Sequence, residues 1–319
     1  MKTTQRLHDL GQSLWLDNIT RDLLDSGTLQ RYIGELSITG LTSNPTIFDE
    51  AVANSMAYDE GICESARGGK SAEALFTELA LEDLRRAADL LRPTYDATEG
   101  MDGWVSMEVS PLLANDTPGT IKAAARIFQQ ADRPNLFIKI PGTPAGIPAI
   151  EESIFAGVPI NVTLLFSREQ YLAAAGAYLR GIERRLAAGR HPRIASVASL
   201  FVSRWDKAVG DTMSTELRNR LGIAISGRTY RAYRELLVSR RWNELAAKGA
   251  RPQRSASNAM AFMVCPMRIS WRNSCVWAIL RQRADASSLR ISATAQAWPP
   301  CATATASIPA WASPRRLEQ

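Results

Sequence analysis

The sequence has few cysteines and no pattern that would use them. Only four occur in 319 residues, at positions 63, 265, 275 and 301. None forms a C-x-x-C pair, so the sequence indicates neither a zinc site nor a disulfide framework. No glycine-rich G-x-G-x-x-G or G-x-x-x-x-G-K-[ST] motif follows the first predicted strand, which weakens the case for a nucleotide-binding domain.

Long apolar runs are also missing. No stretch reaches the roughly 18–20 apolar residues that a membrane span needs. The first ten residues contain no apolar core of a signal peptide. We therefore expect a cytoplasmic protein that does not enter a membrane.

The excess of basic residues is confined to one part of the chain. The net charge is +6, but residues 255–319 hold seven arginines, no lysine and two acidic residues. The first 254 residues hold 31 basic and 30 acidic side chains. Because this main part is nearly neutral, we expect no nucleic-acid partner.

Short apolar runs alternate with longer segments of helical periodicity up to about residue 254. Six runs predict strands, at 13–17, 38–43, 104–109, 136–140, 159–165 and 194–202. This alternation predicts a parallel sheet of right-handed βαβ units, and the continuous apolar character of the strands predicts helices outside it. A (β/α)8 barrel fits best, and a doubly wound sheet is the alternative.

The composition changes abruptly after residue 254. The segment 255–319 contains three of the four cysteines and four of the eight tryptophans, and its stretch 293–316 shows neither strand alternation nor a helical stripe. Six strands are two short of a closed barrel, so we expect strands 7 and 8 to be missing or replaced. We divide the chain into a barrel domain, 1–254, and a divergent, poorly structured segment, 255–319. A translated frameshift near codon 255 is our hypothesis for this change.

One lysine lies inside the apolar run "NLFIKIPGT" at residues 135–143. Lysine is rarely buried without a partner, because desolvating an ammonium is costly. Lys139 could point outward and reach solvent with its amine. Alternatively, burial lowers its pKa and leaves a neutral amine that attacks carbonyl groups. The run alone leaves both interpretations open.

Further polar residues occupy the ends of the other predicted strands. The chemistry of a (β/α)8 barrel lies at the carboxyl ends of its strands. We therefore expect these side chains to converge with Lys139: Asp17, Asn44, Glu108, Asn161, Thr163, Ser199 and Arg204. Taken by itself, Asp17 could equally cap a helix that begins near Thr20.

This set of side chains suits Schiff-base chemistry. A neutral lysine adds to a ketone to give a carbinolamine, which loses water to form an imine. Glu108 is the candidate to move protons in these steps, and Asp17 the candidate base for the β-hydroxyl when a C–C bond breaks. The remaining polar positions could hold sugar hydroxyls (Asn44, Asn161 and Ser199) and a phosphoryl group (Arg204).

Six segments resemble those of the transaldolases, in the family's order: "SLWLDNITRDLL", "GLTSNPTIFDEA", "WVSMEVSP", "NLFIKIPGT", "PINVTLLFS" and "SVASLFVSRWD". The resemblance covers residues 5–254 and is strongest to the bacterial branch. It implies a (β/α)8 barrel of the class I aldolase type and a reaction without cofactor or metal. The family's seventh strand, typically similar to "LLWAST", has no counterpart after "ARPQR" (250–254).

The resemblance also implies an activity in the non-oxidative pentose phosphate pathway. A dihydroxyacetone unit passes from sedoheptulose 7-phosphate to glyceraldehyde 3-phosphate, giving erythrose 4-phosphate and fructose 6-phosphate. By this match Lys139 is the Schiff-base lysine, Glu108 an acid/base acting through water, and Asp17 the acid/base at the C–C bond. The donor-site and water-holding positions match Asn44, Asn161, Thr163 and Ser199, and Arg204 matches a phosphate ligand.

Two other functions remain open on the sequence. One is a Schiff-base aldolase of the same superfamily that forms or cleaves fructose 6-phosphate without transfer. The other is a non-catalytic, truncated relative. The expected partners are small sugar phosphates, and a homo-oligomer is compatible with the sequence.

Overall fold

The computed structural model describes residues 2–43, 45–68, 71–210, 212–259 and 261–264. Its strands are β1 (Ser13–Asp17), β2 (Ile38–Thr42), β3 (Trp104–Glu108), β4 (Leu136–Pro141), β5 (Ile160–Leu165), β6 (Ser196–Phe201), β7 (Arg254–Ala259) and β8 (Ala261–Val264). Its α-helices are α1 (Thr3–Asp9), α2 (Arg21–Asp25), α3 (Thr28–Leu36), α4 (Pro45–Asn54), α5 (Asp59–Arg67), α6 (Ala72–Ala97), α7 (Thr117–Ala131), α8 (Gly146–Ala156), α9 (Arg168–Ala187), α10 (Ser203–Val209), α11 (Leu221–Leu237) and α12 (Arg240–Ala246). Two 3₁₀ turns, η1 (Met56–Tyr58) and η2 (Pro111–Leu113), complete the described elements.

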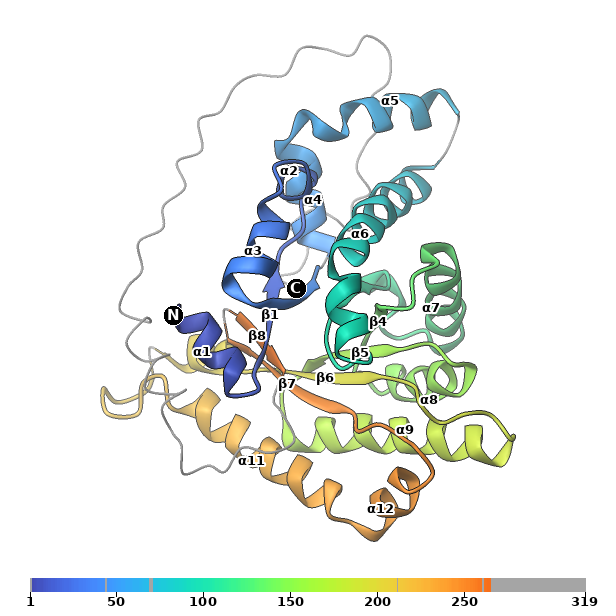
Figure 1. Cartoon of the computed structure of the whole chain (residues 1–319). Helices are drawn as coiled ribbons and strands as arrows, with labels where there is room; N and C mark the ends of the chain where they lie inside the picture. Colours follow the sequence, from blue (N-terminus) through green and yellow to red (C-terminus); the bar gives the residue numbers. More distant parts are fainter. Residues whose placement is uncertain (1, 44, 69–70, 211, 260, 265–319) are drawn as a thin grey trace.

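The strands form a closed barrel in sequence order, from β1 to β8. Each neighbouring pair from β1 to β7 is parallel. The helices lie around this barrel, with α9, α11 and α12 together on one side and α2 to α6 on another (Figure 1). The predicted (β/α) barrel is therefore confirmed, and the doubly wound alternative is wrong because the sheet closes on itself.

The last strand closes the ring in an unusual direction. All six predicted strands are present, and β7 continues the parallel series beside β6. However, β8 is antiparallel both to β7 and to β1. It follows β7 almost immediately, with no helix between them. The expected replacement at the end of the barrel is thus a short hairpin, and it closes the sheet that six strands would leave open.

Alternate residues of each strand lie on the outer and the inner face of the barrel, and the two faces differ in composition. Val105, Ile138, Ile160 and Val162 are fully buried and belong to the main apolar cluster, which also contains helix residues such as Ala174. These strand side chains point outward, since successive residues of a strand point to opposite faces. The alternate residues point into the barrel, where the polar residues collect.

Short side-chain caps fix where helices begin after the strands. Thr20 Oγ1 accepts from the Leu23 amide at 3.0 Å and caps α2. Ser167 Oγ accepts from the Gln170 amide at 3.1 Å and caps α9. Such caps satisfy amides that have no partner within the helix, so each helix starts at a defined distance from the strand before it.

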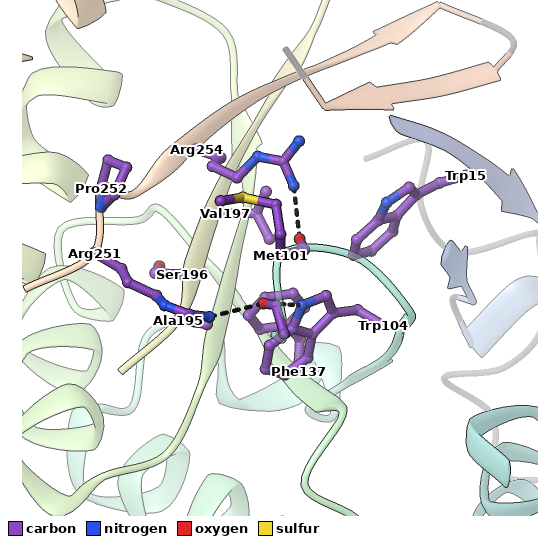
Figure 2. Close-up of a pocket in the computed structure, with 11 residues that line it drawn as sticks. Trp15, Met101, Trp104, Phe137, Ala195, Ser196, Val197, Arg251, Pro252 and Arg254 are labelled. Carbon is purple, nitrogen blue, oxygen red and sulfur yellow. Dashed lines mark hydrogen bonds between the residues drawn. The ribbon is translucent and has the colours of Figure 1, made fainter. Parts of the chain in front are cut away.

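Aromatic rings fill the amino-terminal end of the barrel. The Trp104 and Phe137 rings stack with their centroids 3.9 Å apart, and Trp15 stacks on Phe137 at 6.0 Å. The pocket among these rings has a volume of only about 30 Å³ (Figure 2). Because the rings stack closely around this small pocket, we describe this end as a packed floor. The open end of the barrel, at the carboxyl ends of the parallel strands, is called the mouth below.

Two arginines tie the start of β7 to the loop before β3. Arg251 Nη1 donates to the carbonyl of Gly100 at 3.0 Å, and Arg254 Nη1 donates to that of Met101 at 2.7 Å (Figure 2). Arg254 also lies 3.1 Å from the Asp102 carboxylate. These bonds hold opposite sides of the floor together. Within the described ranges, no helix combines the length and apolar character needed to cross a membrane.

We expect Gly40→Ala to destabilise the protein by about 1–3 kcal/mol, as overpacking of a core does. A Cβ at position 40 would lie 2.4 Å from ring atoms of Trp15, which the stacked Phe137 holds in place. Urea unfolding measures the change. The control is Gly34→Ala in α3, where a Cβ meets no atom within 4 Å and removing a helical glycine should stabilise by about 0.5–1 kcal/mol. Equal effects of the two variants would contradict the packed floor.

Candidate active site

Lys139 and Glu108 form an ion pair inside the barrel. The parallel register places Glu108 of β3 directly beside Lys139 of β4. Lys139 Nζ lies 3.1 Å from Glu108 Oε2 and donates to the backbone carbonyl of Ser43 at 3.2 Å. Lys139 is only 6% exposed, so the interpretation in which its amine reaches solvent is wrong. The charge is held in the interior by a carboxylate and a carbonyl.

Asp17 lies at the mouth of the same barrel, as the last residue of β1. Its side chain is accessible to solvent, yet desolvation by the surrounding protein raises its pKa, and the positive charge of Lys139 partly opposes this rise. The structure therefore brings Asp17 and Lys139 into one electrostatic site. The alternative role as a helix cap is wrong, because Thr20 caps α2 with its own hydroxyl.

A hydrogen-bonded chain crosses the interior from β3 to β6. Asn161 Nδ2 donates to Ser106 Oγ at 3.0 Å, and Ser199 Oγ donates to Asn161 Oδ1 at 2.6 Å. The register places Asn161 beside Lys139. Two of the expected substrate-binding residues, Asn161 and Ser199, are thus directly bonded to each other next to the lysine.

Thr163 follows Asn161 on the same inward face of β5. It is buried, and its backbone carbonyl accepts from the amide of Gly142 at 2.8 Å. The next residue, Leu164, has a left-handed backbone conformation with φ of 56°, where the register with β6 shifts. This bulge ends the regular alternation directly after Thr163, so Thr163 is the last inward residue of its strand before the mouth.

The two remaining predicted ligands differ in position. Arg204 lies in the first turn of α10, just after β6, and is exposed. Its guanidinium carbon lies 6.0 Å from the centre of the Phe201 ring, and it forms no ion pair within the described part of the chain. It is therefore an uncompensated cation at the carboxyl end of β6. Asn44 lies outside the described residues.

Two groups that the structure places in the site are not among the residues expected from the sequence. The carbonyl of Ser43 accepts from Lys139, and no sequence signal marks a backbone group for this role. Ser106 is a different case. It lies two residues before Glu108 on β3, so the period of a strand puts both on the inward face. That spacing could have identified Ser106 once Glu108 was chosen.

A buried network holds the segment that follows Asp17. Arg21, the first residue of α2, pairs with Asp83 at 3.0 Å and with Glu82 at 2.7 Å, both on α6. The Tyr58 hydroxyl donates to Asp83 and accepts from the Arg21 amide, each at 2.8 Å. Asp83 is completely buried. Only three residues separate Arg21 from Asp17, so this network limits how far the carboxylate can move.

Comparisons with known proteins agree with this geometry. The family model described as Transaldolase/Fructose-6-phosphate aldolase matches residues 14–278. Transaldolase 2 of Nostoc punctiforme is 44% identical over 261 residues, which are 76% of this chain and 68% of the relative. Transaldolase of Thermobifida fusca is 46% identical over 258 residues, covering 78% of this chain and 70% of the relative. Transaldolase of Thiobacillus denitrificans is 44% identical over 261 residues, covering 79% of this chain and 73% of the relative.

The chain belongs to the transaldolase family. The resemblance of its motifs to this family is confirmed, and the chain is an enzyme of the transaldolase type. The transaldolase family model extends to residue 278, so it includes β7 and β8. The site residues described above lie on β1, β3, β4, β5 and α10 and at the inner face of β6.

We expect Arg21→Leu to destabilise the protein by about 3–5 kcal/mol at neutral pH, because it leaves the buried Asp83 without its cation. Burial already raises the pKa of Asp83, with the Tyr58 bond and the Arg21 charge opposing it. Without Arg21 this pKa rises further. An ionised, unpaired carboxylate destabilises the fold only above its pKa, so the loss should shrink as the pH is lowered.

Chemical unfolding across a pH series measures this effect. The matched control is Arg133→Leu. It removes the ion-pair partner of Asp89, which lies on α6 as Asp83 does. Because the side chain of Asp89 is more than half exposed, we expect a loss of about 0–1 kcal/mol. If Arg21→Leu lost no more than this control, or lost equally at all pH values, the buried network would not act as described.

Proposed function

We propose that this enzyme transfers a dihydroxyacetone unit between sugar phosphates through an imine on Lys139. The observation that carries the proposal is the buried pair of Lys139 and Glu108, 3.1 Å apart, with the charge of Lys139 also acting on Asp17. A nucleophilic amine, an adjacent proton carrier and a second carboxylate are the groups that aldol chemistry through an imine needs.

Imine formation uses Lys139 and Glu108. Glu108 takes a proton from the ammonium, and the neutral amine adds to the ketone carbon of the donor sugar. The resulting carbinolamine loses its hydroxyl as water after Glu108 returns the proton. We propose that this transfer runs through a water molecule. The contact between Nζ and Oε2 supports Glu108, because it lies within the distance at which a general base works.

Bond cleavage uses Asp17. Its carboxylate takes the proton of the hydroxyl β to the imine, and the C–C electron pair moves onto the iminium nitrogen. An aldose phosphate leaves, and an enamine stays on Lys139. The enamine then attacks the carbonyl of the acceptor, Asp17 returns the proton, and water hydrolyses the new imine. The raised pKa of Asp17 supports this role, because a carboxyl group that both takes and gives a proton works best with a pKa nearer neutrality.

The other predicted residues would hold the substrate. We propose that Asn161, Thr163 and Ser199, with Asn44, bind the donor hydroxyls and the water. The exposed Arg204 suits a phosphate group, because guanidinium matches phosphate oxygens in charge and geometry. The proposed reaction converts sedoheptulose 7-phosphate and glyceraldehyde 3-phosphate into erythrose 4-phosphate and fructose 6-phosphate. We place it in the cytoplasmic non-oxidative pentose phosphate pathway.

We also propose that residues 1–254 carry all of this chemistry and that 255–319 diverge from the family in sequence, although β7 and β8 complete the barrel and the family model reaches residue 278. Every proposed catalytic or substrate residue occurs at or before Arg204. The three relatives described above match between 76% and 79% of this chain. A translated frameshift near codon 255 is our proposed origin of the divergence.

We expect sodium borohydride to trap a covalent adduct when the protein is incubated with fructose 6-phosphate, and Lys139→Ala to abolish it. Intact-protein mass spectrometry measures the adduct, and peptide mapping locates it. The control, Lys122→Ala, alters an exposed lysine of α7 and should trap as well as the wild type. An adduct that survives in Lys139→Ala would contradict the proposed nucleophile. The absence of any adduct in the wild type would favour a non-catalytic relative.

The two carboxylates should act at separate steps. We expect Asp17→Asn to retain the trapped adduct but to slow transfer about 10²–10⁴-fold, because imine formation does not need the base at the C–C bond. Glu108→Gln should instead slow adduct formation itself, since the base beside Nζ is lost. Rapid-quench trapping and a coupled transfer assay, run with and without erythrose 4-phosphate, separate these effects. Equal activity without this acceptor would indicate an aldolase.

A further inference from the structure

Asn161 is held from both sides by serines that lie on different strands. Its Nδ2 donates to Ser106 Oγ on β3, and its Oδ1 accepts from Ser199 Oγ on β6. The three side chains have no exposed surface. The sequence and its family resemblance predict substrate-binding roles for Asn161 and Ser199 but none for Ser106.

The bond between Ser106 and Asn161 reaches across an intervening strand. Ser106 is in register with Phe137 of β4, and Asn161 is in register with Lys139, two residues further along β4. The bond therefore crosses the inner face of β4 between the levels of the aromatic floor and the lysine. Ser106 is the group that connects Asn161 to β3 at this depth.

This arrangement limits which atoms of the Asn161 amide remain free to form further hydrogen bonds. A primary amide has two N–H donors and two oxygen lone pairs. Among the described residues, the serines occupy one donor and one lone pair, which leaves one of each for a ligand. The terminal torsion of asparagine is broad and nearly two-fold, so an unheld amide can rotate. A rotated amide would present oxygen where the substrate meets nitrogen.

We propose that Ser106 is a positioning residue that fixes the Asn161 amide beside Lys139 for binding of the donor sugar. The inference rests on the proposed function, in which Asn161 touches the substrate. Ser106 does not touch the substrate itself; it acts through Asn161. Ser199 completes the orientation from β6, and its remaining hydrogen-bonding capacity stays available to a donor hydroxyl.

Ser106→Ala should raise the KM for fructose 6-phosphate about 3–10-fold, the loss expected for one neutral hydrogen bond, with a smaller change in kcat. In an Asn161→Ala background, Ser106→Ala should have no further effect on this KM, because the group on which it acts is gone. A purely structural role would reduce activity equally in both backgrounds. Ser153→Ala is the matched control, since Ser153 is a buried serine of α8 whose hydroxyl has no partner within the described part of the chain.

Borohydride trapping separates this inference from the proposed function. If the wild type forms no adduct with fructose 6-phosphate, the proposed function fails. If the wild type forms it but Ser106→Ala keeps a normal KM, or if the two substitutions have additive effects, the positioning role is overturned. Should Ser106→Ala fail to fold, Ser106→Cys carries the same test, because a thiol is a weaker acceptor of similar size. An unchanged KM in that variant would also overturn the proposal.

Discussion

A closed ring of strands forces every second residue into its interior, and the rest of this structure depends on what the chain places there. The outward residues of the central strands are aliphatic and pack against the surrounding helices. The inward residues divide by depth. Trp15, Trp104 and Phe137 fill the floor, whereas Ser106, Asn161, Ser199, Lys139 and Glu108 follow above it. A buried lysine is tolerable at this depth because a carboxylate and a carbonyl meet its ammonium, while aromatic rings block water from the other end of the barrel.

The same division explains why the site is fixed before any substrate arrives. Lys139 and Glu108 lie on adjacent, registered strands, so their separation is set by backbone hydrogen bonds and not by flexible loops. Among the described strands, β2 is the one that pairs with Asp17, the last residue of β1, and it does so at Thr42. Asp17 therefore needs support from elsewhere, and the Arg21 network with α6 supplies it. Rigid strands thus hold the proposed nucleophile, and a buried ionic network holds the segment that carries the second carboxylate of the proposed mechanism.

Sequence reasoning succeeded where a pattern was local. The six apolar runs and the polar strand ends could both be read from short windows. The Arg21 network could not, because Asp83 lies 62 residues away in sequence and no local pattern links the two. The bond from Ser106 to Asn161 spans 55 residues and skips a strand, so it needs the register of the folded barrel. The closing strands escaped prediction because residues 254–264 show no clear alternation, and their pairing with β6 and β1 is imposed by closure of the ring.

The direction of the last strand follows from the length of its connection. A parallel strand requires a crossover of about a dozen residues or more, whereas an antiparallel strand can follow a tight turn. β7 ends at Ala259 and β8 begins at Ala261, so only the antiparallel direction is possible. β8 then pairs with Ser13, Leu14 and Trp15 and stops short of Asp17. β8 and β1 therefore join near the floor, where the barrel has to keep water away from the aromatic rings. At the mouth, the proposed catalytic residues come from β1, β3 and β4, so the hairpin can complete the barrel without supplying any of them.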